Sequence, residues 1–143
     1  MAVQVDYFKI EELVDPQTFE QFGDNAWWFL DPNAVEALVA MREAFGPITV
    51  NDWLWGGHYT QSGFRHPHST TGATLSQHKF GRGFDVKSKH FTAEQMQSFI
   101  LANRERFPHI TTMENAKHTK TWLHFDTRIR LENHIAIFDL IKE

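Results

Sequence analysis

The chain has 143 residues, of which 41% are hydrophobic and 22% charged, a composition typical of one ordinary globular domain. A formal net charge of −4 excludes the strongly basic surface of a nucleic-acid-binding protein, and no apolar run approaches the roughly 20 residues of a membrane span. The lack of cysteine excludes disulfides, thiolate metal sites and cysteine nucleophiles, whereas nine histidines direct the search to a cysteine-free metal site.

The first third of the chain predicts two helices and a strand. Pro16 is suited to begin a helical turn that Gly23 ends. The clearest helix spans residues 32–45, with Asp31 as its N-cap and a Gly-Pro pair directly after it. Residues 48–55 have the length and the β-branched content of a strand.

Residues 56–74 differ from the segments around them. They are rich in glycine, serine, threonine and histidine and show neither a helical nor a strand period. Unstructured stretches of this length within a compact domain are uncommon and are often functional. A second helix is expected over 93–106, because Thr92 and Gln95 form a capping box at its start.

The C-terminal part predicts strands. Residues 109–115 and 120–128 are two candidate strands joined by a polar turn, and 134–141 is a strand or a last helix, with strand favoured. The mixed order of helices and short strands predicts an α+β fold, with a short antiparallel sheet and flanking helices. We expect residues 1–143 to form this single small domain.

Two segments carry candidate ligands for a metal ion. His78 and Asp85 are separated by a turn with two glycines, which lets the backbone fold tightly so that both side chains converge. In the later strand, alternation places Trp122, His124 and Asp126 on one face, with the apolar residues between them in the core.

These residues match the needs of a catalytic zinc ion. Such a site uses three protein ligands and one open position, and His78, Asp85 and His124 supply that number of ligands for one Zn²⁺ ion. A nearby carboxylate must then take a proton from the attacking water. We favour Glu114 as this base; Asp126 is the rival, although a role in orienting a ligand is more expected of Asp126.

The segment SQHKFGRGFD, residues 76–85, resembles the SxHxxGxAxD signature of a family of zinc metallopeptidases. This family includes VanY-type D-Ala-D-Ala carboxypeptidases, VanX-type dipeptidases and phage L-Ala-D-Glu endolysins. The segment TWLHFD resembles the family's second motif, and ITVNDWLWGGHYTQSGFR resembles its strand and loop leading to an arginine. The resemblance covers about residues 45–128.

The resemblance implies the hedgehog/DD-peptidase fold and zinc binding by His78, Asp85 and His124. It also implies that Arg65 lies in the substrate cleft, where it would hold a carboxylate or stabilise an oxyanion, and that Ser76 lies at the edge of the site. Trp122 either lines the cleft or packs in the core. The implied activity is hydrolysis of peptidoglycan stem peptides, by a D,D-carboxypeptidase or an L-Ala-D-Glu endopeptidase, as in a phage endolysin or a related wall-remodelling enzyme.

The chain departs from the family pattern at two positions. Gly83 replaces an alanine, and Thr121 stands where many members have the catalytic glutamate. Glu114 would replace that glutamate if the two C-terminal strands pair. The alternatives are a catalytically silent member that serves as a binding or structural phage component, and an enzyme for the free D-Ala-D-Ala dipeptide.

The remaining expectations concern the surroundings of the site. We expect a monomer with no nucleic-acid or membrane partner and, since no signal peptide is visible, a location in the host cytoplasm before release to the cell wall if the protein is phage-encoded. His66 and His68 are interpreted as polar loop residues near the cleft. Asp126 and Arg128 could form an exposed ion pair that contributes little to stability.

Overall fold

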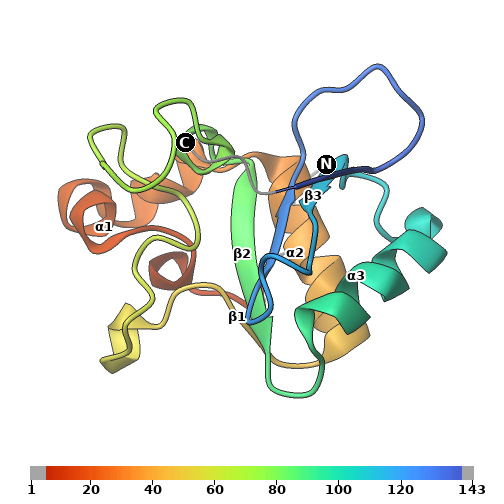
Figure 1. The fold of residues 1–143 in the computed structure, drawn as a ribbon. Helices are drawn as coiled ribbons and strands as arrows, with labels where there is room; N and C mark the ends of the chain where they lie inside the picture. The colour runs from red at the N-terminus through yellow and green to blue at the C-terminus, as the bar shows by residue number, and fades with distance from the viewer. Residues whose placement is uncertain (1–5, 140–143) are drawn as a thin grey trace.

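The computed structural model describes residues 6–139 as an α+β domain (Figure 1). Its five-stranded sheet has the order β1-β2-β4-β3-β5, with bounds β1 Ile48–Thr49, β2 Gly83–Ser88, β3 Thr112–Glu114, β4 Leu123–Asp126 and β5 Ala136–Phe138. The pairs β1–β2, β2–β4 and β3–β4 are antiparallel, as predicted, but β5 pairs with β3 in parallel. The sheet is therefore mixed. After β4 the chain passes to the outer side of β3, where β5 runs parallel to β3 and in the opposite direction to β4.

The three α-helices begin where their capping residues predict. They are α1 Pro16–Phe22, α2 Pro32–Phe45 and α3 Ala93–Ala102. The Asp31 side chain accepts from Asn33 N at the start of α2, and both hydrogen bonds of the Thr92–Gln95 capping box are present. The predicted helix 93–106 is too long, because the backbone leaves the α-helical region at Asn103 (φ −131°) before a short 3-10 turn.

The predicted strand 48–55 is wrong beyond its second residue. The buried Asn51 side chain donates to Val14 O and accepts from Ser62 N, and the Asp52 side chain accepts from Tyr59 N. These side chains form hydrogen bonds with backbone groups of other segments. The residues after Thr49 therefore do not continue the pairing with β2, and the chain leaves the sheet. The strands predicted over 109–115 and 120–128 are likewise shorter than expected.

Alternation along the strands separates a core face from a polar face. Phe84, Val86, Leu123 and Phe125 are fully buried on the face that α2 and α3 cover (Figure 1). The opposite face carries the charged residues of the candidate site, as the alternation of residues 122–126 predicts.

The C-terminal segment confirms the strand interpretation over the helix. Ala136–Phe138 forms β5 at the edge of the sheet, while residues 140 and 141 of the predicted segment lie outside the described residues. Within residues 6–139, no helix has the length and apolar character needed to cross a membrane.

Gly81 lies in the turn before β2, and its substitution tests how tightly that turn packs. Its φ is 71°, and a Cβ atom there would lie 1.9 Å from Phe29 O. Gly56 has a similar left-handed conformation (φ 84°), but a Cβ atom there would meet nothing within 4 Å. We predict that Gly81→Ala lowers the free energy of unfolding by about 3 kcal/mol or more, through backbone strain and overpacking.

The matched variant Gly56→Ala adds only the backbone strain, so its expected loss is about 1–2 kcal/mol. Urea unfolding of both variants, followed by circular dichroism, measures the difference. Equal losses would contradict the tight contact between this turn and residue 29.

Candidate metal centre

One row of side chains crosses four strands on the polar face of the sheet. Asp85 on β2 is the register partner of His124 on β4. The β3–β4 register, continued by one residue, places Glu114 beside His124, and Glu114 in turn pairs with Phe138 on β5. Because residues opposite one another carry their side chains on the same face, the row is set by strand pairing alone.

His78 reaches this row from a 3-10 turn, Gln77–Phe80, that lies against β2. The Ser76 side chain caps the turn by accepting from His78 N at 3.3 Å. Gly83 allows the close approach, since a Cβ atom there would lie 3.1 Å from His78 N. This explains why glycine suits the position where the family signature has alanine.

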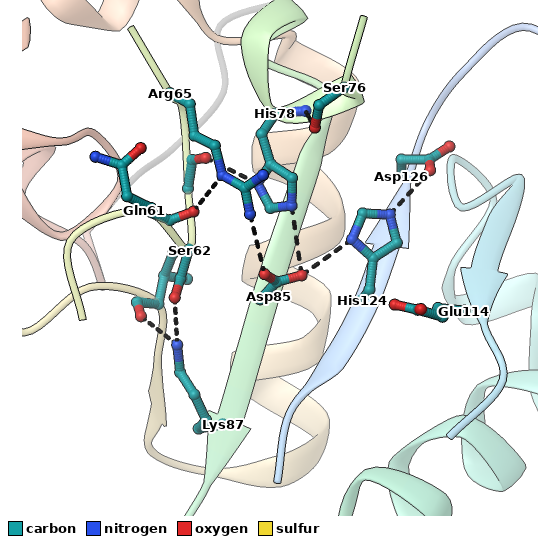
Figure 2. Close-up of polar contacts among 12 residues, drawn as sticks. Gln61, Ser62, Arg65, Ser76, His78, Asp85, Lys87, Glu114, His124 and Asp126 are labelled. Carbon is teal, nitrogen blue, oxygen red and sulfur yellow. Dashed lines mark hydrogen bonds and ion pairs between the residues drawn. The ribbon is translucent and has the colours of Figure 1, made fainter. Parts of the chain in front are cut away.

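The structure brings the three predicted ligands together. His78 Nε2 lies 3.4 Å from Asp85 Oδ1, and His124 Nδ1 lies 3.0 Å from the same oxygen (Figure 2). One ligand atom from each residue falls within 4.8 Å of the others, so the group could hold a metal ion.

Hydrogen bonds on the far side of each imidazole fix which nitrogen faces the centre. His78 Nδ1 lies 2.9 Å from Gly63 O, and a carbonyl only accepts, so Nδ1 carries the proton and Nε2 keeps its lone pair. His124 Nε2 lies 3.1 Å from Asp126 Oδ2, which in the same way leaves Nδ1 to face Asp85. Metal-binding histidines are held in this manner by a carbonyl or a carboxylate behind the ring. The donor set therefore fits a metal ion.

The three candidate ligand side chains carry different charges when no metal ion is bound. Burial lowers the pKa of His78 below its usual value, so this ring is neutral. Burial alone would raise the pKa of Asp85, but the hydrogen bond and the positive charge of His124 hold that pKa well below the usual range. Burial also opposes protonation of His124, yet Asp126 and Asp85 raise the pKa of His124 to about 9. Without a metal ion, a proton on His124 Nδ1 thus supplies the positive charge between the two carboxylates.

Asp126 is fully buried, so its interpretation as half of an exposed ion pair is wrong. Arg128 donates to it through Nε at 2.7 Å and Nη2 at 2.6 Å, while His124 approaches Oδ2. Burial opposes its ionisation, but His124 and Arg128 together lower the pKa of Asp126. Both oxygens are thereby occupied, which suits Asp126 to orient the His124 ring.

Glu114 lines a cavity of about 500 Å³ together with all three candidate ligands. The residue is only 8% exposed, and its backbone carbonyl accepts from the Gln97 side chain on α3 at 2.8 Å. We call this space the main cavity; Arg65, Ser76, Trp122, Arg128 and Arg130 also line it. Thr121, at the position of the family's glutamate, is exposed and does not line it.

Arg65 lies beside the candidate ligands rather than among them. Its Nη2 is 3.6 Å from Asp85 Oδ2, and its Nε donates to Gln61 O at 2.7 Å. Trp122 lines the main cavity and is 36% exposed, so the structure shows the cleft and not the core as its environment.

Other residues of the centre were missed or misplaced by the sequence analysis. The role of the Gly63 carbonyl could not be predicted, because every residue has a backbone carbonyl and the sequence does not show which one accepts a hydrogen bond from His78. Lys87, two residues after Asp85 on the same strand face, is signalled only by that spacing; its Nζ donates to Ser62 Oγ at 2.8 Å. His66 and His68 lie in a loop, as predicted; His66 is buried against Gln21 and stacks on His68, and neither histidine lines the main cavity.

Comparison with known proteins finds no matching family model, no matching curated protein and no matching solved structure. The evidence for a metal centre is therefore its own geometry: three converging donor atoms, two oriented imidazoles and an adjoining cavity.

Metal binding should displace the proton held by His124. His78 is neutral and Asp85 ionised, so we predict that zinc binding at pH 7 releases about one proton and that affinity rises about tenfold per pH unit below the His124 pKa of about 9. Calorimetry in buffers of different ionisation enthalpy counts the protons. Binding without proton release would contradict the assigned protonation.

The same proton affects the stability of the metal-free protein. The pKa of His124 is higher in the folded state than the ordinary histidine value of 6.5, so its contribution to stability is full below about pH 6.5 and is lost as the pH rises through about 9.

Asp126 should tune metal affinity without being a ligand. We predict that Asp126→Asn weakens zinc binding by about 10–100-fold, because His124 loses the carboxylate behind its ring. The matched control is Asp139→Asn, since Asp139 also contacts a histidine, His118, at 3.2 Å but on the exposed surface. Competition with a chelating dye measures both affinities; an unchanged affinity in Asp126→Asn would exclude the orienting role.

Proposed function

We propose that the protein is a zinc-dependent peptidase that hydrolyses an amide bond in peptidoglycan stem peptides. The observation that carries the proposal is the convergence of His78 Nε2, Asp85 Oδ1 and His124 Nδ1 beside a cavity that also holds a buried carboxylate. The resemblance of residues 45–128 to the zinc metallopeptidases supplies the substrate class.

The donor set supports zinc as the metal. Two imidazole nitrogens and one carboxylate oxygen are ligands typical of catalytic zinc, whereas magnesium and calcium prefer oxygen ligands throughout. A bound zinc ion supplies a Lewis acid that polarises the scissile carbonyl and activates water for attack.

Glu114 is proposed as the proton carrier. Its place beside His124 in the row across the sheet puts a carboxylate next to the proposed site of attack. It would take the proton released by the attacking water and then give it to the nitrogen of the leaving amine, as a general base followed by a general acid.

Arg65 is proposed to act on the substrate. Its guanidinium is held by Gln61 O and lies next to Asp85, so its charge lies at the edge of the proposed metal position. There it would bind a substrate carboxylate or stabilise the oxyanion that develops on the carbonyl oxygen.

We further propose that the protein is a phage endolysin or a related wall-remodelling enzyme, made in the host cytoplasm before it reaches the wall. The second candidate function is a silent member of the same fold that binds without hydrolysis. The exposed Thr121 at the position of the family's glutamate favours this alternative.

Digestion of purified peptidoglycan by the zinc-loaded protein, analysed by mass spectrometry, tests the proposal. We expect new stem-peptide termini, and we expect Glu114→Gln to slow their appearance by about 10²–10⁴-fold, the usual contribution of a general base. The control Glu36→Gln alters a carboxylate that pairs with His109 on the surface and should keep full activity.

Each other result has a distinct meaning. Intact muropeptides at full zinc content would favour the silent member. Full activity in Glu114→Gln would keep the peptidase but remove Glu114 as its base.

A further inference from the structure

Gln97 is a polar residue on the buried side of α3. It is 9% exposed, and the other buried residues of this helix are apolar, namely Ala93, Met96 and Ile100. A buried amide is costly unless hydrogen bonds satisfy it, whereas an apolar side chain of similar size would fill the same space without that cost. A glutamine at this position therefore points to a role for its hydrogen bonds.

Both ends of the Gln97 amide bind the backbone next to Glu114. The Nε2 atom donates to Glu114 O at 2.8 Å, and the Oε1 atom accepts from Ala116 N at 3.3 Å. One side chain thus holds the peptide groups on both sides of residue 115. Because the Glu114 side chain starts from this backbone, the two hydrogen bonds fix the point from which its carboxylate reaches the main cavity.

The pairing of β3 with β4 ends one residue before Glu114, at the pair of Met113 with Phe125. At Glu114 itself, Gln97 supplies a hydrogen bond to the backbone carbonyl, while the Glu114 side chain lies next to that of His124 on β4 (Figure 2). The separation between this carboxylate and the metal centre therefore depends on α3 as well as on the sheet.

We propose that Gln97 is a positioning residue for Glu114, which it serves by holding the backbone of Glu114 in place beside the metal centre. This rests on the proposed peptidase function, in which Glu114 carries the proton. Proton transfer needs the carboxylate within hydrogen-bond reach of the attacking water, and a displacement of about 1 Å costs on the order of 100-fold in rate. Neither hydrogen bond of Gln97 goes to a candidate metal ligand, so the effect should fall on the chemical step and not on zinc binding.

The variant Gln97→Met removes both hydrogen bonds with little change in side-chain volume. We expect kcat for release of stem-peptide termini from solubilised peptidoglycan to fall about 10–100-fold, with KM and zinc affinity within about twofold of the unsubstituted protein. If Gln97→Met does not fold, Gln97→Asn takes its place, because this amide is one methylene shorter and cannot hold both backbone groups.

The matched control is Gln95→Met. Gln95 lies on the same helix and also binds the backbone, since its Oε1 accepts from Thr92 N at 2.9 Å, but it is exposed and lies at the start of α3. We expect this variant to keep the full kcat.

A double-mutant cycle separates a positioning role from a general structural one. If Gln97 acts through Glu114, Gln97→Met causes no further loss, within about twofold, once Glu114→Gln has removed the carboxylate. A change that only loosens the fold would lower the rate by the same factor in both backgrounds. Equal factors in the two backgrounds, or an unchanged kcat in Gln97→Met, would overturn the positioning role and keep the peptidase.

Amide hydrogen exchange tests the two hydrogen bonds without any activity. We expect the Ala116 N–H to exchange faster in Gln97→Met, because it loses its acceptor, and at its original rate in Gln95→Met. An unaltered Ala116 exchange rate in Gln97→Met would overturn the inference. No cleavage by the unsubstituted protein at full zinc content would overturn the proposed function and the role of Gln97 with it.

Discussion

The pairing of Asp85 with His124 across two antiparallel strands is the constraint on which the rest of the site depends. Phe84 and Phe125, the next pair in the same register, are fully buried in the core. A slip of one residue would turn His124 into the core and Phe125 towards the cavity, so the hydrophobic effect fixes the register. The burial of two phenylalanine rings thereby sets the distance between two candidate metal ligands.

The buried charges of the centre need a cation. Asp85 and Asp126 lie on either side of the His124 ring, and a buried carboxylate without a partner is costly. Arg128 compensates Asp126, while a proton or a metal ion on Nδ1 compensates Asp85. A positive charge at the position between His124 and Asp85 therefore stabilises the polar face of the sheet, in addition to Arg65, whose Nη2 lies 3.6 Å from Asp85 Oδ2.

Local features of this fold could be predicted from the sequence, and long-range ones could not. The caps at Asp31 and Thr92 predicted where two helices begin, and alternation predicted that His124 and Asp126 share a face. The departure of the chain from the sheet after Thr49 depends on single side chains, such as Asn51, that bind distant backbone groups. The convergence of His78 with His124 depends in addition on sheet register, which spacing along the chain does not contain.

The most direct test of the metal centre is a crystal structure of the zinc-loaded protein, with anomalous diffraction recorded on both sides of the zinc absorption edge. We expect one strong peak within bonding distance of His78 Nε2, Asp85 Oδ1 and His124 Nδ1, with Asp126 still behind the His124 ring. A peak at another group of histidines, or coordination of zinc through His124 Nε2, would contradict the proposed metal centre.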